Sequence, residues 1–228
     1  MNGPRTKRGA QTKANLLAAA ETVFAEQGYQ AASISRITER AHVAQGTFYL
    51  YFSSKLDLFE QLVDDLNRRV RKAMSDGAAR GTNRAEAERE GFREFFAFTA
   101  EHPALYRVVR EAEYVAPGAM RSHYERIVEG YRDGLTRAKA TGEIGDVDPE
   151  VAAWALMGIG EMIGMRYVLW PTGDAGAYGS GATPVPEHVF DEMVAFVQRA
   201  LGTAAPSAPG TPSTTTSVAT AAHTKEDS

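Results

Sequence analysis

SISRITERAHVAQGTFYLYFSSK is the sequence of residues 33–55. It predicts two short helices joined by a tight turn at His42 and Val43, followed at once by the start of a long helix. Ser33 and Ser54 each precede one of these helices, and a serine hydroxyl there accepts a hydrogen bond from a free backbone N–H. A helix–turn–helix unit of this kind can place its second helix in the major groove of DNA.

The flanking sequence extends this unit into a helical chain. Apolar residues at helical spacing predict a first helix over residues 12–27, and Gly28 after it suits a backbone position with positive φ. The second helix of the unit is expected over residues 45–52, with Phe48 and Phe52 in the core. Asp148 is expected to cap a later helix that runs to Trp170. Because no segment alternates with a period of two, we expect an all-α fold of about nine helices.

Charge is distributed unevenly along the 228 residues. Residues 1–55 hold seven Lys and Arg against three Glu, a net charge of +4, whereas residues 56–228 carry a net charge of −8. A basic front on an acidic body indicates a polyanionic partner for the front. The chain has no cysteine, and its beginning lacks the apolar stretch of a signal peptide. We therefore expect a cytoplasmic protein with no membrane segment.

Composition divides the chain into four parts. Residues 1–10 are expected to form a basic, flexible arm, and residues 11–55 a three-helix DNA-binding domain. Residues 56–202 are expected to form a larger helical domain for ligand binding and dimerisation. From residue 203 to residue 228 the chain is rich in Ala, Pro, Ser and Thr, so it is expected to be a disordered tail.

Residues 12–58 resemble the DNA-binding domain of the TetR family of bacterial transcriptional regulators. The resemblance rests on FAEQGYQAASI at the end of the first helix and on VAQGTFYLYFSSKLDLF after the turn. Tyr51 departs from the pattern, since many members carry histidine at this position. The resemblance implies a dimer that binds an operator and responds to a small-molecule effector, with repression as the default outcome.

The candidate DNA-binding residues are short or polar, because bulk would hold the helix away from the bases. Gln can form paired hydrogen bonds with adenine, and the Thr methyl group can contact a thymine methyl. Tyrosine hydroxyls can reach the DNA backbone, and Lys55 resembles the family position that contacts phosphate. Each residue also has a plain structural interpretation as a cap, a core aromatic or a solvated side chain. The predicted set is Ser33, Arg36, Gln45, Gly46, Thr47, Tyr49, Tyr51 and Lys55.

The last two helices are the expected homodimer interface. Gly160 and Gly164 lie four residues apart and would permit close helix approach, although packing within one chain is the alternative. The resemblance implies the same interface, a four-helix bundle formed by the last two helices of each copy.

Aromatic residues and methionines between the head and this interface are candidates for a ligand pocket. They suit a hydrophobic compound, and a nearby arginine suits an anionic end on it. Aromatics at helical spacing also form ordinary cores, so both interpretations stay open. The predicted pocket residues are Phe95, Phe98, Tyr106, Arg110, Tyr114, Tyr124, Tyr131, Trp154, Met157 and Met162.

Two alternatives come from other functional classes. One is an all-α, ligand-binding enzyme, and the other is a helical adaptor that binds protein through residues 45–52. Glu39 and His42 match only half of a helical di-iron pattern, and the glycines at 173, 176, 179 and 181 lack the rest of a phosphate-binding motif, so no catalytic residue, metal or cofactor is expected. If the protein were such an adaptor, the net positive charge of residues 1–55 would have no role.

Overall fold

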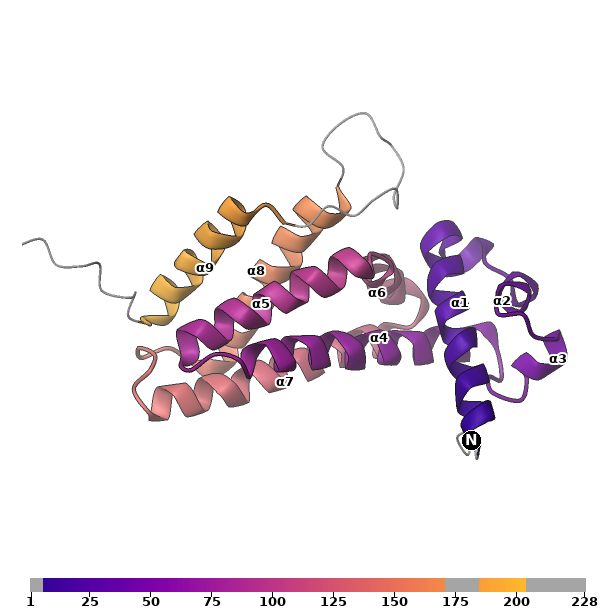
Figure 1. Ribbon diagram of the computed structural model, residues 1–228, viewed down its shortest axis with the longest axis horizontal. Helices are drawn as coiled ribbons and strands as arrows, with labels where there is room; N and C mark the ends of the chain where they lie inside the picture. Colours follow the sequence, from indigo (N-terminus) through magenta and orange to yellow (C-terminus); the bar gives the residue numbers. More distant parts are fainter. Residues whose placement is uncertain (1–5, 171–184, 204–228) are drawn as a thin grey trace, which may run out of the picture.

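The computed structural model describes residues 6–170 and 185–203, and all regular structure within them is helical (Figure 1). The prediction of an all-α fold is therefore confirmed. In the described residues the elements are α1 (Lys7–Ala31), α2 (Ile34–Arg40), α3 (Gln45–Phe48), α4 (Lys55–Ala78), α5 (Arg84–Glu101), α6 (Ala104–Val115), α7 (Pro117–Ala140), α8 (Pro149–Gly164), the π-helical turn η1 (Met165–Leu169) and α9 (Glu187–Leu201).

The head consists of α1, α2, α3 and the first turns of α4. Phe24, Phe48 and Phe59 are completely buried in its core, and the rings of Phe24 and Phe59 meet edge to face with centroids 5.3 Å apart. Helices as short as α2 and α3 are not stable alone, because nucleation of a helix is unfavourable. Packing of their apolar faces against α1 and α4 therefore maintains them.

The turn between α2 and α3 is closed by a C-cap centred on His42. Its N–H donates to the Glu39 carbonyl at 3.1 Å, and the Val43 N–H donates to the Thr38 carbonyl at 3.0 Å. These two bonds form a Schellman motif, which needs a left-handed residue, and His42 has a φ of 55°. The predicted turn is confirmed, with a histidine at a position that favours glycine.

The predicted N-caps are confirmed. Each side chain accepts a hydrogen bond from the backbone of its helix: Ser33 from Arg36 at 3.3 Å, Ser54 from Asp57 at 3.0 Å, and Asp148 from Val151 at 3.0 Å. Such caps satisfy N–H groups that have no partner within the helix.

The first helix begins earlier than predicted. α1 starts at Lys7, where the Thr6 hydroxyl accepts a hydrogen bond from the Gly9 N–H at 3.1 Å. Lys7 and Arg8 therefore belong to the first helical turn and not to an arm that ends at residue 10. Residues 1–5 of the predicted arm lie outside the described residues.

α3 is shorter than predicted, since it ends at Phe48. The residues after it form tight turns in which Leu50 donates to Thr47 at 3.2 Å and Tyr51 to Phe48 at 2.9 Å. Such i→i−3 bonds wind the chain more tightly than an α-helix does. They leave Phe52 completely buried, so its predicted place in the core is confirmed.

The body is built around α4 and α5, which run side by side in opposite directions (Figure 1). Gly77 permits this close approach, because a Cβ atom there would lie 2.6 Å from the Glu90 carbonyl oxygen. α7 packs on α4, while α8 and α9 both pack on α5. A second core forms between these helices and includes Phe92, Phe96, Leu135, Leu156 and Val197.

α6 joins the body to the head. The Glu111 carboxylate accepts a hydrogen bond from the Tyr29 N–H at 2.8 Å, and Arg107 donates to the Ala25 carbonyl. Gly28 has a φ of 75°, as predicted, and a Cβ atom there would lie 2.6 Å from Glu111 Oε1. Glycine is thus required both by the backbone conformation and by the close approach of α6.

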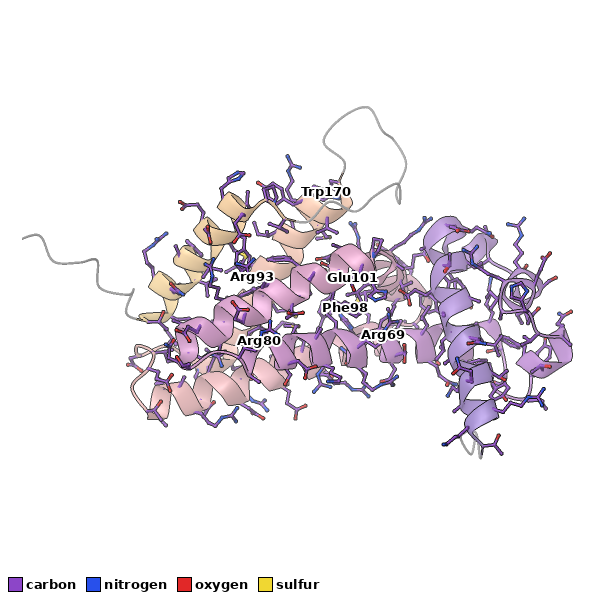
Figure 2. All side chains as sticks on the ribbon, viewed as in Figure 1. Arg69, Arg80, Arg93, Phe98, Glu101 and Trp170 are labelled. Carbon is purple, nitrogen blue, oxygen red and sulfur yellow. The ribbon has the colours of Figure 1, made fainter. Side chains whose placement is uncertain are left out.

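A polar cluster lies at the same junction. Arg69 of α4 donates to Glu21 of α1 at 2.8 Å, and its guanidinium lies 5.5 Å from the centroid of the Phe98 ring (Figure 2). The His102 ring is tilted by 40° against the Phe98 ring with centroids 4.5 Å apart, and its Nδ1 lies 3.0 Å from Glu21 Oε1. Phe98 is therefore part of the junction between head and body.

Within residues 6–170 and 185–203, no helix combines the length and apolarity that a membrane span requires. Thr203 is buried, and its N–H donates to the Gln198 carbonyl at 3.0 Å, so the folded part extends one residue beyond the predicted boundary. The predicted disordered tail from residue 204 onward lies outside the described residues, as do residues 171–184.

Candidate DNA-binding surface and ligand pocket

α3 lies at the end of the head that is farthest from the body (Figure 1). Gln45 and Gly46 are exposed, Thr47 is half-buried, and the Tyr49 side chain is 55% exposed. Leu50, which the sequence analysis did not single out, is 76% exposed beside them. This tip presents an amide, a hydroxyl, a phenol and an isobutyl group to the surroundings.

Gly46 has no structural role that the chain itself explains. It lies inside α3 with ordinary helical geometry, and a Cβ atom added to it would meet no atom within 4 Å. Glycine lowers helix stability by about 1 kcal/mol relative to alanine. A glycine that neither packing nor backbone conformation requires is consistent with a partner that approaches this surface closely.

Three other predicted DNA-binding residues lie on α2, at its N-cap and just after α3. Arg36 is exposed and forms no ion pair within the described part of the chain, whereas Arg40 pairs with Glu26 at 3.5 Å. The Ser33 hydroxyl is already used as the N-cap of α2. Tyr51 is half-buried and packs against the core of the head. Arg36 is therefore the free cation nearest in sequence to α3 among the residues described.

Lys55 has hydrogen-bond partners within the chain. Its Nζ donates to the Tyr29 carbonyl at 2.7 Å and to the Ala32 carbonyl at 2.9 Å. The same atom lies 4.4 Å from the centroid of the Tyr29 ring. Lys55 thus ties the end of α1 to the start of α4, and this geometry does not support a phosphate contact by its ammonium group.

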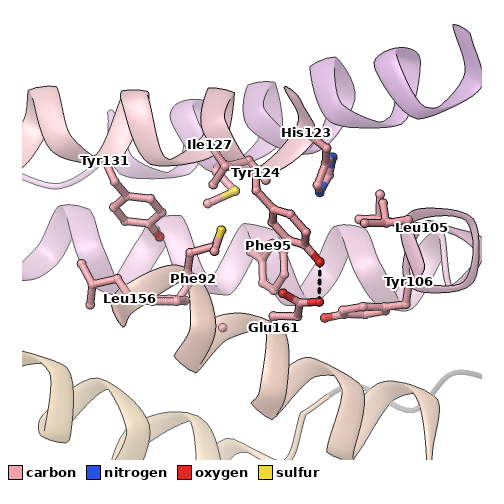
Figure 3. Close-up of a pocket in the computed structure, with 14 residues that line it drawn as sticks. Phe92, Phe95, Leu105, Tyr106, His123, Tyr124, Ile127, Tyr131, Leu156 and Glu161 are labelled. Atoms are coloured by element: carbon pink, nitrogen blue, oxygen red, sulfur yellow. Dashed lines mark hydrogen bonds between the residues drawn. The ribbon is translucent and has the colours of Figure 1, made fainter. Parts of the chain in front are cut away.

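An apolar cavity of about 40 Å³ lies inside the body between α4, α5, α6, α7 and α8 (Figure 3). One water molecule needs about 10–15 Å³ of such space, whereas ligand pockets hold a few hundred Å³. A ligand must therefore displace side chains to enter. Five predicted pocket residues line this cavity: Phe95, Tyr106, Tyr124, Tyr131 and Met157.

One corner of the cavity is polar. The Tyr124 hydroxyl donates to Glu161 Oε1 at 2.8 Å (Figure 3). The Tyr106 hydroxyl is buried and has no hydrogen-bond partner among the described residues. Burial raises the pKa of both phenols, and Glu161 raises the pKa of Tyr124 further. Both hydroxyls therefore stay protonated at neutral pH.

His123 is a buried, uncharged wall of the same cavity. Burial lowers its pKa from 6.5 to about 4. The Asn67 amide nitrogen lies 3.1 Å from His123 Nδ1 and donates to the His123 carbonyl at 2.9 Å. An amide donor facing Nδ1 favours the neutral ring. In residues 6–170 and 185–203, no three His, Asp or Glu side chains converge in a way that could hold a metal ion.

The other five predicted pocket residues do not line the cavity. Trp154 and Met162 lie on the outer face of α8, where they are 42% and 54% exposed. Tyr114 is 84% exposed, and Arg110 is exposed with its Nη1 3.8 Å from Met165 Sδ. Phe98 packs at the junction described above. The predictions for Phe98, Arg110, Tyr114, Trp154 and Met162 were therefore wrong as pocket walls.

Sequence reasoning missed several walls of the cavity. One of them, Glu161, carried a usable signal, because a charged residue in an otherwise apolar helix needs a polar partner. The aliphatic and aromatic walls look like ordinary core residues in the sequence. The walls that were missed are Met74, Phe92, Leu105, Val109, His123, Ile127, Leu156, Gly160 and Glu161.

The outer face of α8 and α9 carries large apolar side chains without cover. Val151 is 68% exposed and Phe196 is 56% exposed, and Trp154 and Met162 lie on the same helices. Trp170, at the end of the π-helical turn, is 40% exposed (Figure 2). Large apolar side chains exposed on neighbouring helices are a feature of interaction surfaces.

Gly160 and Gly164 do not contribute to that outer face. A Cβ atom on Gly160 would lie 3.0 Å from a Phe92 ring carbon, and one on Gly164 would lie 1.7 Å from the Tyr106 hydroxyl. Both glycines make room for aromatic rings of the same chain. Their predicted role in bringing two copies together was wrong, and the alternative of packing within one chain is confirmed.

Comparison with known proteins gives three results. Residues 16–62 match the family model of the bacterial regulatory proteins of the tetR family. The HTH-type transcriptional activator FasR of Mycolicibacterium smegmatis is 32% identical over 136 residues, which cover 58% of each protein. The chain thus spans little more than half the length of this curated relative.

Among solved structures, a TetR-family regulator from Rhodococcus sp. superposes with a TM-score of 0.69 at 18% identity, covering 84% of this chain and 99% of the other. The FadR regulator of Bacillus subtilis, in complex with stearoyl-CoA, gives a TM-score of 0.67 at 20% identity, covering 81% of this chain and 96% of that chain. At such identities the similarity establishes the fold.

Proposed function

Because the chain belongs to the tetR family of bacterial regulatory proteins through residues 16–62, we propose that it is a ligand-responsive, sequence-specific DNA-binding regulator. It binds a palindromic operator in the cytoplasm as a homodimer and is released by a small hydrophobic ligand. Repression of the operator's gene is the default, although the FasR relative is named an activator. The alternatives are a helical ligand-binding enzyme and a protein-binding adaptor.

The exposed tip of α3 is the observation that carries this proposal. Gln45 reads adenine, and the Thr47 methyl and the Leu50 side chain contact thymine methyl groups. Gly46 lets the helix approach the bases closely. Ser33, Arg36, Tyr49 and Tyr51 reach the phosphate backbone from either side of the groove.

The homodimer uses the outer face of α8 and α9. Burial of the exposed apolar side chains there favours association, because it removes apolar surface from water. A dimer presents two heads, and successive major-groove faces lie about 34–36 Å apart. Two copies of α3 at that spacing explain a palindromic site.

The ligand enters the cavity among Phe95, Tyr124, Tyr131 and Met157. The stearoyl-CoA of the Bacillus FadR complex supports an apolar chain as the ligand class. Because the cavity holds only about 40 Å³, filling it moves its walls, and α6 is one of them. α6 also holds α1 through the bond between Glu111 and the Tyr29 N–H, so movement of α6 changes the position of the head. A ligand acts this way only if it prefers one conformer.

Selection of binding sites from fragmented genomic DNA by the purified protein tests the proposal. We expect enrichment of a sequence with twofold symmetry, whose affinity falls steeply with salt as phosphate contacts require. Equal affinity for all duplexes would contradict a sequence-specific regulator, and no binding to any duplex would favour the adaptor.

A further inference from the structure

A second cavity, of about 290 Å³, lies beside the apolar one between α4, α5 and α7. Gly130 and Gly134, one helical turn apart on α7, form part of its wall. A Cβ atom on Gly130 would meet nothing within 4 Å, so the missing side chain leaves the space open. The cavity can hold a ligand group of moderate size without rearrangement.

The lining of this cavity is basic. Arg71, Arg84 and Arg137 line it, and Glu88 is its one acidic wall residue. Arg84 pairs with the buried Glu88, and its Nε is buried without a hydrogen-bond partner in the described part of the chain. Arg71 and Arg137 form no ion pair or side-chain hydrogen bond with any described residue. Two guanidinium groups therefore remain available to an anion.

The two cavities are neighbours and share three walls, Met74, Ile127 and Tyr131. Their polarities are opposite. The only acidic or basic side chain in the wall of the apolar cavity, apart from the neutral His123, is the carboxylic Glu161, which disfavours an anion there. A ligand with an apolar chain and an anionic end therefore fits in one orientation only. Its anionic end lies in the basic cavity and its chain lies in the apolar cavity.

We propose that the cavity between α4, α5 and α7 binds the phosphate-bearing end of an amphiphilic effector, while the apolar chain of that effector passes between Met74 and Tyr131 into the neighbouring cavity. Guanidinium groups bind phosphate through paired, charge-assisted hydrogen bonds. Arg71 and Arg137 supply these donors, and Arg84 is held in place by Glu88. This inference rests on the proposed function, which includes an apolar ligand. It specifies in addition that the ligand carries a phosphate and that it enters through the cavity between α4, α5 and α7.

Calorimetric titration of the full-length protein with n-octyl phosphate and with 1-octanol tests this inference. Charge-assisted hydrogen bonds contribute enough for octyl phosphate to bind about tenfold to hundredfold more tightly than octanol. The double variant Arg71→Gln/Arg137→Gln is expected to lose that preference and keep its affinity for octanol. Arg84 is left unchanged, because its removal would leave the buried Glu88 carboxylate without its ion-pair partner. Arg121→Gln, an exposed arginine on α7, is the matched control and is expected to behave as wild type.

A second variant tests the location. Gly130→Leu fills the open space on α7 and raises helix propensity, so the protein folds while octyl phosphate binding falls at least tenfold. Gly118→Leu on the same helix is the control, since a Cβ atom there also meets nothing within 4 Å.

Three results would overturn the inference. They are equal affinity of the wild type for both probes, no binding of octyl phosphate, or unchanged binding in the two cavity variants. Each is measured without DNA, so it is distinguishable from a failure of operator binding. Octanol binding without phosphate preference would leave the apolar ligand site intact.

Discussion

Lys55 acts as a cap for the end of α1, and this role has consequences for stability. Its ammonium group satisfies the carbonyls of Tyr29 and Ala32, which follow the non-helical Gly28. Lys55→Met keeps the aliphatic stem and removes the donors, so we expect the free energy of unfolding to fall by about 1–2 kcal/mol. Urea denaturation measures this change. Lys72→Met, at an exposed residue paired only with Asp76, is the control. Unchanged stability together with weaker DNA binding would restore the phosphate role.

His123 makes the stability of the body depend on pH. The unfolded chain binds a proton near pH 6.5, whereas the folded protein binds it only near pH 4. Stability is therefore complete above pH 6.5 and is lost as the pH falls toward 4, by about 2 kcal/mol at pH 5. His123→Gln is expected to remove this part of the pH dependence in denaturation curves between pH 7.5 and 5. His188→Gln, at an exposed residue, should retain it. A wild type equally stable at both pH values would show that His123 is not buried in solution.

Sequence alone identifies those residues whose role is local. Ser33, Ser54 and Gly28 were predicted correctly because a cap or a positive φ depends on the neighbouring backbone. The partners of Lys55 lie at the end of α1 and at its C-cap, more than 20 residues away, so no local pattern reveals them.

Among the helices, α6 contacts two different parts of the molecule through two of its faces. One face of the helix lines the apolar cavity with Leu105, Tyr106 and Val109. Glu111 on another face accepts the hydrogen bond from the Tyr29 N–H. α6 is thus in contact with both the ligand site and the head.

This role of α6 is open to a direct measurement. Glu111→Ala removes the acceptor of the Tyr29 N–H, and we expect hydrogen exchange of that amide to become at least about tenfold faster through local opening. Glu113→Ala, at an exposed position of the same helix, is the control. If the two variants exchange at the same rate as wild type, α6 does not hold α1 through this bond.

The positions of the helices could be predicted from apolar periodicity and capping residues. Which face of each helix is buried could not be predicted in the same way. α8 is apolar on almost every side, so its sequence does not indicate which face is buried. The structure turns Gly160 and Glu161 inward and Trp154 and Met162 outward. Packing against α5 and α7 sets this rotation, and it accounts for the errors in the predicted pocket and interface.

At the scale of the whole molecule, the outer face of α8 and α9 determines assembly. Phe196→Glu places a charge in the expected dimer interface, where a buried unpaired charge is costly. Because Phe196 is 56% exposed in a single chain, the variant folds, and we expect a monomer in sedimentation velocity at micromolar concentration. Tyr114→Glu, on the exposed side of α6, should remain a dimer. A dimer of the Phe196→Glu protein would place the interface elsewhere.

The volumes of the two cavities are also a property of the whole molecule. They depend on how five helices pack together, and no single segment specifies that arrangement. Composition predicted an apolar ligand with an anionic end, whereas the positions of Arg71, Arg84 and Arg137 between three helices emerged only from the fold.

The tip of α3 is the surface that we propose reads DNA bases. The most direct measurement compares the affinity of wild type and of Gln45→Ala/Thr47→Ala for the selected operator and for a scrambled duplex, with Gln30→Ala as the control. We expect the wild type to prefer the operator, and the double variant to lose about 1–3 kcal/mol of that preference per lost base contact while keeping its affinity for the scrambled duplex. An unchanged preference in the double variant would show that the tip of α3 does not read the bases.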